Sequence, residues 1–272
     1  VMDGQEPLGI ENEEDKEERK TFLRKIGYKL WIMFHNSIYD IEWKYYDLLY
    51  GNYSEDVKFY KKIIKNGNVL ELMCGTGRIS AKLPEKLEKW CLDSDYRMLN
   101  IASEKNKDIK CVKADVRDFH INRKFDYILI PLNSILLFQN KEKEKILTLS
   151  KEHIKENGKI IIDMIPPPDF EESMVYLGDH KVSDDLEIWR FFIPNYSDDM
   201  IILNLTYFYD IFEKGNYRRE SAILTLYLEN LFSMSEIIKN SGLRTIELYG
   251  DYNNSKYDPA ESERMIFVLE RE

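Results

Sequence analysis

The chain has 272 residues, of which 43% are hydrophobic and 32% are charged, which is enough to bury one sizeable core. Its formal net charge of −10 gives a field that repels phosphate backbones, so we expect no nucleic-acid partner. No stretch approaches the ~18 to 20 uninterrupted apolar residues of a membrane helix. We therefore expect no membrane partner and a cytoplasmic location.

Two segments precede the first predicted strand. Residues 1–18 contain the acidic run ENEEDKEE and few apolar side chains, which predicts a disordered acidic arm. In residues 19–67, aromatic and aliphatic side chains recur at helical spacings, as at Phe22, Ile26 and Leu30. We predict two or three helices in this segment.

Five short and mostly apolar segments follow, separated by helix-compatible stretches. This alternation is typical of a parallel sheet with helices on both faces. Residues 68–168 are therefore assigned to an α/β core. The predicted strands are Asn68–Met73, Lys89–Leu92, Ile109–Lys113, Phe125–Ile130 and Lys159–Ile165.

The pattern changes after the fifth predicted strand. Residues 169–232 contain long runs of β-branched and aromatic residues, such as MIILNLTYFYDIF, and predict an antiparallel β insertion. Residues 233–272 return to the core with a short helix and two closing strands, Arg244–Tyr249 and Arg264–Leu269. The expected fold is a Rossmann-like, seven-stranded, mostly parallel α/β sheet with an antiparallel insertion after the fifth strand.

The stretch VLELMCGTGRIS, Val69 to Ser80, predicts a strand, a tight turn at Gly75 and Gly77, and a helix. The third glycine of a dinucleotide fingerprint and the GK[ST] of a phosphate-binding loop are both missing. Glu71, inside the strand, disfavours a pyrophosphate and suits a cationic ligand. S-adenosylmethionine carries a sulfonium and an ammonium group, and so fits this requirement.

Two further acids follow the next predicted strands. Asp93 ends the second strand, where a carboxylate can accept bonds from both ribose hydroxyls. Asp115, together with the backbone amide of Val116, follows the third strand and can face an adenine edge. The three cysteines lack the paired spacing of a zinc site or a disulfide framework, so we expect buried thiols and no metal.

Four motifs occur in a fixed order: ELMCGTGR, CLDSDYRML, KADVRDF and FDYILIPLNSI. In this order they resemble the successive cofactor motifs of class I S-adenosylmethionine-dependent methyltransferases, over roughly Ile38 to the C-terminus. YDLLYG, the insertion and SGLRTIELYGDY are similar to the small-molecule branch, which contains glycine and aminosugar N-methyltransferase-like enzymes. The resemblance implies S-adenosyl-L-methionine as cofactor, S-adenosyl-L-homocysteine as product, and N-terminal helices that cover the cofactor site.

The resemblance also implies roles for individual residues. Glu71 is expected at the methionine part, Asp93 at the ribose and Asp115 at the adenine amino group, while Tyr39 and Asn133 are expected to position the reacting groups. The full set of expected cofactor-binding residues is Tyr39, Glu71, Cys74, Gly75, Thr76, Gly77, Asp93, Ser94, Met98, Asp115, Val116, Leu132 and Asn133.

Aromatic residues indicate where the acceptor binds. Some lie on the helices before the first motif, and others alternate along the insertion, so that one face of it, including Phe191 and Tyr207, could line a pocket. Packing in the sheet core, or a homodimer contact through the insertion, is the alternative role. The residues expected at the acceptor are Tyr45, Tyr46, Trp189, Tyr209 and Arg218.

The expected reaction is methyl transfer to N or O of a small-molecule acceptor by in-line displacement, which needs no metal and no covalent nucleophile. The Asn-Pro-Pro-aromatic motif of DNA and protein-glutamine methylases is absent from Ile130–Ser134, which disfavours bases and glutamine amides. Two alternatives stay open. One is a protein or peptide methyltransferase, because an acidic surface suits a basic substrate; the other is a cofactor-binding but inactive partner subunit.

Overall fold

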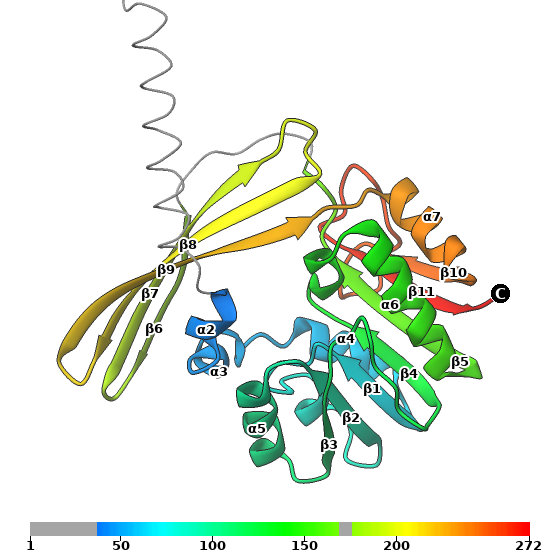
Figure 1. Cartoon of the computed structure of the whole chain (residues 1–272), viewed down its shortest axis with the longest axis horizontal. Coiled ribbons are helices and arrows are strands. Elements are labelled where there is room, and N and C mark those ends of the chain that lie inside the picture. Colours follow the sequence, from blue (N-terminus) through cyan, green and yellow to red (C-terminus); the bar gives the residue numbers. More distant parts are fainter. Residues whose placement is uncertain (1–36, 169–175) are drawn as a thin grey trace, which may run out of the picture.

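The computed structural model describes residues 37–168 and 176–272, and Figure 1 shows how they are arranged. The acidic arm predicted for residues 1–18 lies outside this range. So do residues 19–36 of the predicted helical segment and residues 169–175 of the predicted insertion. Of the helices described, none combines the length and the apolar character needed to cross a bilayer.

A seven-stranded sheet forms the core, with strand order β10-β11-β5-β4-β1-β2-β3. Strands β1 to β5 run parallel, whereas β11 is antiparallel to both β5 and β10. The predicted fold class is therefore confirmed. The strands are β1 (Asn68–Leu72), β2 (Glu88–Asp93), β3 (Ile109–Lys113), β4 (Phe125–Ile130), β5 (Ile154–Met164), β10 (Leu243–Tyr249) and β11 (Met265–Arg271).

Helices cover both faces of this sheet, because successive strand residues point to opposite faces. On one face, Val69 and Leu129 pack in one cluster with Phe59 of α4 (Glu55–Ile63). On the other face, Leu70 and Ile128 belong to a core shared with α6 (Asn140–His153) and α7 (Leu231–Asn240). Helix α5 (Tyr96–Lys105) covers β2 and β3 on the α4 side.

The helix predicted after Gly77 is reduced to one 3₁₀ turn, η1 (Ser80–Lys82), so this expectation was wrong. Leu83 leaves the helical region, with φ −66° and ψ 158°. The reason is Pro84, because the proline ring disfavours a helical conformation in the residue before it. The positive end of a long helix, which attracts phosphate in dinucleotide folds, is therefore missing from this turn.

A second, antiparallel sheet follows β5 and leans away from the core (Figure 1). Its strands are β6 (Tyr176–Ser183), β7 (Leu186–Tyr196), β8 (Ile202–Glu213) and β9 (Asn216–Tyr227). Its inner face, which carries Ile188 and Tyr209, packs in one apolar cluster with Ile41 of α2 (Ile38–Glu42) and with Leu49 of α3 (Tyr46–Tyr50). The two short helices therefore lie between the insertion and the core.

Candidate active site

One cavity of about 1020 Å³ opens at the carboxyl ends of β1 to β4. The strand order reverses between β1 and β4, and ligands of open α/β sheets bind at such a point. Helices α2 and α3 and the inner face of the β6–β9 sheet line the other side. The predicted cofactor residues that line the cavity are Tyr39, Glu71, Cys74, Gly75, Asp93, Ser94, Met98, Asp115, Val116, Leu132 and Asn133. That they bind the cofactor stays a prediction.

Glu71 is buried in β1 and lines the cavity. Its Oε2 accepts hydrogen bonds from the backbone N–H of Ser80 at 2.9 Å and from the Ser80 hydroxyl at 2.5 Å. Burial raises the pKa of Glu71 to about 7. A cation bound beside this carboxylate would favour its charged form, so the group suits the ammonium of a ligand.

Asp93 links the ends of β1 and β2. Its Oδ2 accepts a hydrogen bond from the Gly75 N–H at 2.8 Å, and its Oδ1 accepts one from the Asp95 N–H at 2.9 Å. Gly75 has a φ of 53°, and a Cβ there would approach the Tyr46 Cζ to 3.7 Å. The turn therefore packs against the Tyr46 ring, and its left-handed backbone favours glycine at this position.

Asp115, the carboxylate predicted to bind the adenine amino group, is bonded to Arg117. This arginine was not among the residues predicted for the site. Arg117 donates to Asp115 through Nε at 2.9 Å and through Nη2 at 2.6 Å, and it also donates to Glu142 of α6 at 2.7 Å. The bond from Arg117 lowers the pKa of Asp115 to about 2. An adenine amino group at this position must share Asp115 with Arg117.

Thr76 and Gly77 do not line the cavity. The Thr76 hydroxyl donates to Asp47 of α3 at 2.7 Å and accepts a bond from Lys105 of α5 at 2.9 Å. Gly77 lies beneath α5, where a Cβ would come within 3.0 Å of the Ala102 Cβ. These two residues connect the turn to its neighbouring helices.

Gly77→Ala is expected to lower the free energy of unfolding by about 2–3 kcal/mol, from a left-handed backbone and from overpacking. The φ of Gly77 is 66°. Gly215→Ala is the matched control, because Gly215 has a φ of 77° but no atom within 4 Å of the added Cβ. Urea unfolding of both variants measures the difference. Equal losses would contradict the packing contribution.

Arg78 follows the turn but pairs with neither Glu71 nor Asp93. It instead forms an ion pair with Asp56 of α4, donating to Oδ1 at 3.1 Å and also bonding Oδ2, and it donates to the Tyr53 carbonyl at 2.9 Å. The side chain of Asp56 is fully buried and that of Arg78 nearly so. The pair fixes α4 to the turn, and no arginine among the described residues forms an ion pair with Glu71 or Asp93.

The loop after β4 carries two consecutive left-handed residues, Leu132 with φ 46° and Asn133 with φ 64°. Asp163, at the end of β5, holds this loop through bonds from Leu132 N–H at 3.2 Å to its carboxylate and from Asn133 N–H at 2.9 Å to its carbonyl. Asp163 also accepts bonds from Tyr252 at 2.7 Å and from Arg264 at 2.8 Å. These three supporting residues, Asp163, Tyr252 and Arg264, were not predicted from the sequence.

A buried polar cluster joins α2 to the insertion. Glu42 accepts hydrogen bonds from Arg190 at 2.8 Å and from the Tyr209 hydroxyl at 2.7 Å. Arg190 also pairs with Asp179 and with the Tyr50 hydroxyl, and lies 4.9 Å from the Tyr50 ring centre. Arg190 lines the cavity, which it reaches from β7.

A β-bulge brings Asp179 to this cluster. Leu177 pairs with Phe191, but Asp179 pairs with Arg190, so Gly178 is the extra residue in β6. Bulges of this kind re-aim a side chain. A Cβ on Gly178 would lie 3.3 Å from the Phe192 ring, which leaves little room for any other residue.

Only some of the residues predicted to contact the acceptor line the cavity. Tyr46 lines the cavity. Tyr209 is fully buried, and Tyr45 bonds Arg218 away from the cavity. Trp189 was placed on the wrong face: it pairs with Asp210 whereas Tyr209 pairs with Arg190, and directly paired residues share a face. Phe191 is on the outer face for the same reason.

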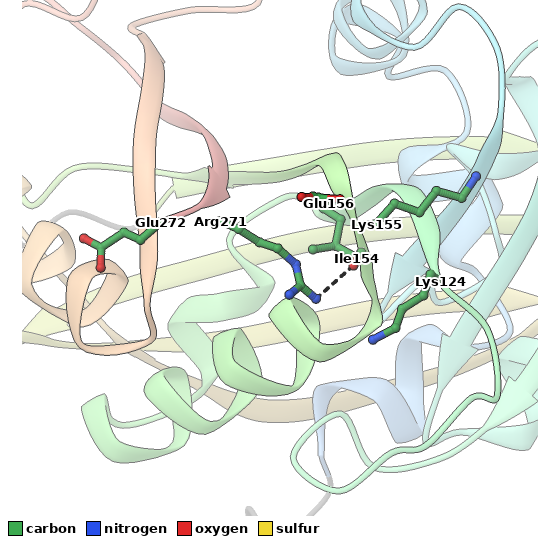
Figure 2. Close-up of a pocket in the computed structure, with 6 residues that line it drawn as sticks. All are labelled: Lys124, Ile154, Lys155, Glu156, Arg271 and Glu272. Carbon is green, nitrogen blue, oxygen red and sulfur yellow. Dashed lines mark hydrogen bonds between the residues drawn. The ribbon is translucent and has the colours of Figure 1, made fainter.

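Figure 2 shows a second hollow, at the start of β5 and the end of β11. Two of its basic side chains are used at the C-terminal end of α6: Arg271 donates to the Ile154 carbonyl at 3.0 Å, and both Arg271 and Lys124 bond carbonyls of the last helical turn. Cations stabilise helix C-termini in this way. This hollow is therefore part of a helix cap at the opposite end of the parallel strands.

Comparison with known proteins supports the same class. A family model described as a methyltransferase domain matches residues 69–158. A putative methyltransferase of Bacillus subtilis (strain 168), YqeM, is 25% identical over 224 residues, covering 76% of this chain and 85% of that protein. A model described as an adenosine specific kinase matches only residues 1–29, outside the described range.

Solved structures show the same fold. An S-adenosylmethionine-dependent methyltransferase from Clostridium acetobutylicum ATCC 824 aligns with a TM-score of 0.71 at 19% identity, over 84% of this chain and 96% of that one. CalS10, an amino pentose methyltransferase from Micromonospora echinaspora, aligns with a TM-score of 0.67 at 14% identity, over 88% of this chain and 98% of that one.

Residues 69–158 carry a methyltransferase domain, and the sheet has the fold of the S-adenosylmethionine-dependent methyltransferases above, so the chain is an enzyme that takes its methyl group from S-adenosylmethionine. The family, the enzyme class and the cofactor expected from the four sequence motifs are confirmed. Among the relatives above, YqeM is similar over most of its length and CalS10 shares the fold.

Proposed function

We propose that this enzyme methylates a small-molecule acceptor, and that an amine nitrogen is favoured over a hydroxyl oxygen. The observation that carries the cofactor part of this proposal is the pair of carboxylates Glu71 and Asp93, which lie at the ends of adjacent strands and line the same cavity. A cationic amino acid part beside Glu71 and a ribose beside Asp93 use both groups. A pyrophosphate between them would be repelled.

The residues present fit S-adenosylmethionine. Glu71 would hold the ammonium group, Asp93 the ribose hydroxyls, and the buried side chain of Met98 would pack on the adenine. The cofactor, when bound, supplies an activated methyl group on sulfur. The chain's own part is to align the acceptor with that group and to exclude water, which Tyr39 and Tyr46 do from α2 and α3.

The preference for an amine rests on the shortage of a general base. No histidine lines the cavity within the described ranges. Glu42 and Asp179, the carboxylates of the insertion side, are both bonded to Arg190. A hydroxyl needs a base to become nucleophilic, whereas an amine reacts once it has lost a proton to water. The fold shared with the amino pentose methyltransferase CalS10 supports the same choice.

The volume and lining of the cavity support a small acceptor. About 1020 Å³ lies at the upper end of the range for single-ligand sites, and so leaves room for an acceptor beside the cofactor. Apolar side chains line the insertion side, with Leu205 and Leu224 on the sheet and Phe138 opposite. An acceptor with one apolar face fits this wall.

Calorimetric titration with S-adenosylmethionine, S-adenosylhomocysteine and NAD tests the cofactor, and methyl-labelled cofactor in cell extract tests the acceptor. We expect micromolar binding of the first two and none of NAD, with label only in the low-mass fraction. Label in a polypeptide band would support a peptide substrate instead. Binding without transfer to any extract fraction would support an inactive subunit.

Asp93→Asn is expected to weaken S-adenosylmethionine binding by about 1–3 kcal/mol, the range for losing a charge-assisted hydrogen bond. Asp118→Asn is the control, because Asp118 is exposed and does not line the cavity. Calorimetry measures both affinities, and the melting temperature of each unliganded variant shows whether the turn at Gly75 is disturbed. An unchanged affinity in Asp93→Asn would remove Asp93 from the site.

A further inference from the structure

The side-chain amide of Asn133 is held in one orientation. Its Oδ1 lies 2.9 Å from the backbone N–H of Ile165 and 3.2 Å from Nη2 of Arg264. Both neighbours are hydrogen-bond donors, so the atom they contact must be the amide oxygen and not the amide nitrogen. The orientation of this amide is therefore determined by its surroundings.

The amide nitrogen is left free. Among the described residues, Nδ2 of Asn133 makes no hydrogen bond, and it is absent from the buried polar atoms that lack a partner. Asn133 lines the cavity. With the oxygen bound to Ile165 and to Arg264, the NH₂ group on the other arm of the planar amide is left for a ligand in the cavity.

The support of this amide is rigid. Arg264 is bonded to Asp163 through Nε at 2.8 Å and through Nη2 at 2.5 Å, and the side chain of Asp163 is fully buried. Asn133 itself has a φ of 64°, which costs free energy that surrounding contacts must offset. A fixed donor on a strained, fully supported loop is typical of a functional position.

We propose that Asn133 is not a cofactor ligand, as the resemblance implies, but a specificity-determining residue whose NH₂ group donates a hydrogen bond to an oxygen of the acceptor. The preferred acceptor is then an amine with a hydroxyl, carbonyl or carboxylate oxygen on the neighbouring carbon. Arg264 and Asp163 act as positioning residues that hold the amide. The proposal rests on the proposed function, since it concerns the acceptor of that same methyl transfer.

The direction of this hydrogen bond distinguishes Asn133 from an asparagine that binds the reacting nitrogen itself. An asparagine that accepts a bond from the N–H of its substrate must offer its amide oxygen, and here that oxygen is already bound twice. The NH₂ group cannot accept a proton. Asn133 therefore recognises an oxygen beside the reacting nitrogen, and does not act as a base.

Matched pairs of amines test the proposal. Each pair differs by one oxygen on the neighbouring carbon, as 2-aminocyclohexanol differs from cyclohexylamine, and the rate of methyl transfer from labelled S-adenosylmethionine is compared within each pair. We expect the natural enzyme to prefer the oxygen-bearing amine at least tenfold, because a site built to hydrogen-bond a substrate rejects the analogue that lacks the partner.

Two variants keep the test independent of folding. Asn133→Gly suits a φ of 64° and removes the donor, so the preference should fall to about one while the affinity for S-adenosylmethionine stays within about threefold. Arg264→Leu leaves Asn133 in place but frees its amide, and should reduce the preference by several-fold. Melting temperatures test whether both variants are folded.

Other results would overturn the proposal. Equal rates within every pair, in the natural enzyme, would exclude an oxygen-reading residue. A preference unchanged in Asn133→Gly, with S-adenosylmethionine binding weakened tenfold or more, would assign the donor to the cofactor carboxylate. No transfer to any amine, with cofactor binding intact, would reject the proposed amine acceptor, and this inference with it.

Discussion

Replacing Glu71 with Gln is expected to stabilise the unliganded enzyme at pH 8 and to weaken its binding of S-adenosylmethionine. Burial raises the pKa of Glu71 from 4.5 to about 7. Between these values the unfolded chain loses the proton more readily than the folded one, so stability falls as pH rises. At about 1.4 kcal/mol per pH unit, the penalty approaches about 3 kcal/mol above pH 7.

The pH dependence gives this prediction its control. Below pH 4.5 the carboxyl is protonated in both states, so the variant and the natural protein should have nearly equal free energies of unfolding. Urea unfolding at pH 4.5 and pH 8 measures the change. A stability difference that does not grow with pH would falsify the raised pKa of Glu71.

The same substitution, Glu71→Gln, should weaken cofactor binding although it stabilises the unliganded protein at pH 8. A cation beside Glu71 favours its ionised form, so binding should release a proton near pH 7, and calorimetry in buffers of different ionisation enthalpy detects this release. In Glu71→Gln the release should disappear and the affinity should fall by about 1–3 kcal/mol, because a charged hydrogen bond is lost. Unaltered affinity would separate Glu71 from the ligand.

Arg190→Met should lower the free energy of unfolding by about 3–5 kcal/mol, the range for removing one partner of a buried ion pair. Arg190 is buried and is bonded to Glu42 and Asp179, which are both largely shielded from water. Without the guanidinium, two carboxylates face each other in a low-dielectric site. The pKa of Glu42, already raised by burial, should rise further, so the loss should be larger at pH 8 than at pH 5.

Arg219→Met is the matched control for this second prediction. Arg219 belongs to the same sheet and pairs with Asp210 at 2.6 Å, but it lies on the outer face and its side chain is 59% exposed. Exposed pairs contribute less than about 1 kcal/mol. Urea unfolding of both variants, at both pH values, compares the two faces directly. Similar losses in both variants would contradict the buried cluster as the link between α2 and the insertion.

The parts predicted well depend on short-range patterns. The apolar segments between Asn68 and Met164 became the five parallel strands, because a doubly covered sheet requires continuous apolar runs. The carboxylates at the ends of β1 and β2 reached one cavity, because parallel strands end at the same edge of a sheet. Tyr39 and Asn133 also reached this cavity.

The features that the sequence did not predict depend on strand register and on contacts between residues far apart in the chain. Alternation along β7 identified two faces but could not say which was inner, and the bulge at Gly178 changes the register by one residue. The pairing of Arg264 with Asp163 joins positions 101 residues apart. One usable signal was present: Arg190 stands inside the apolar run EIWRFFIP, where a charge is tolerated only with a buried partner.

The cavity is assembled from two separately encoded parts, the strand ends of the core and the inner face of the β6–β9 sheet. In the proposed arrangement, where the insertion side binds the acceptor, substitutions at Leu205, Tyr207 or Leu224 should change which molecules are methylated without altering the residues around Glu71 and Asp93. Such an enzyme can diversify its substrates over evolution, or be re-engineered by grafting a related insertion. A grafted insertion must carry an arginine that pairs with Glu42, because Arg190 joins the insertion to α2 through this bond.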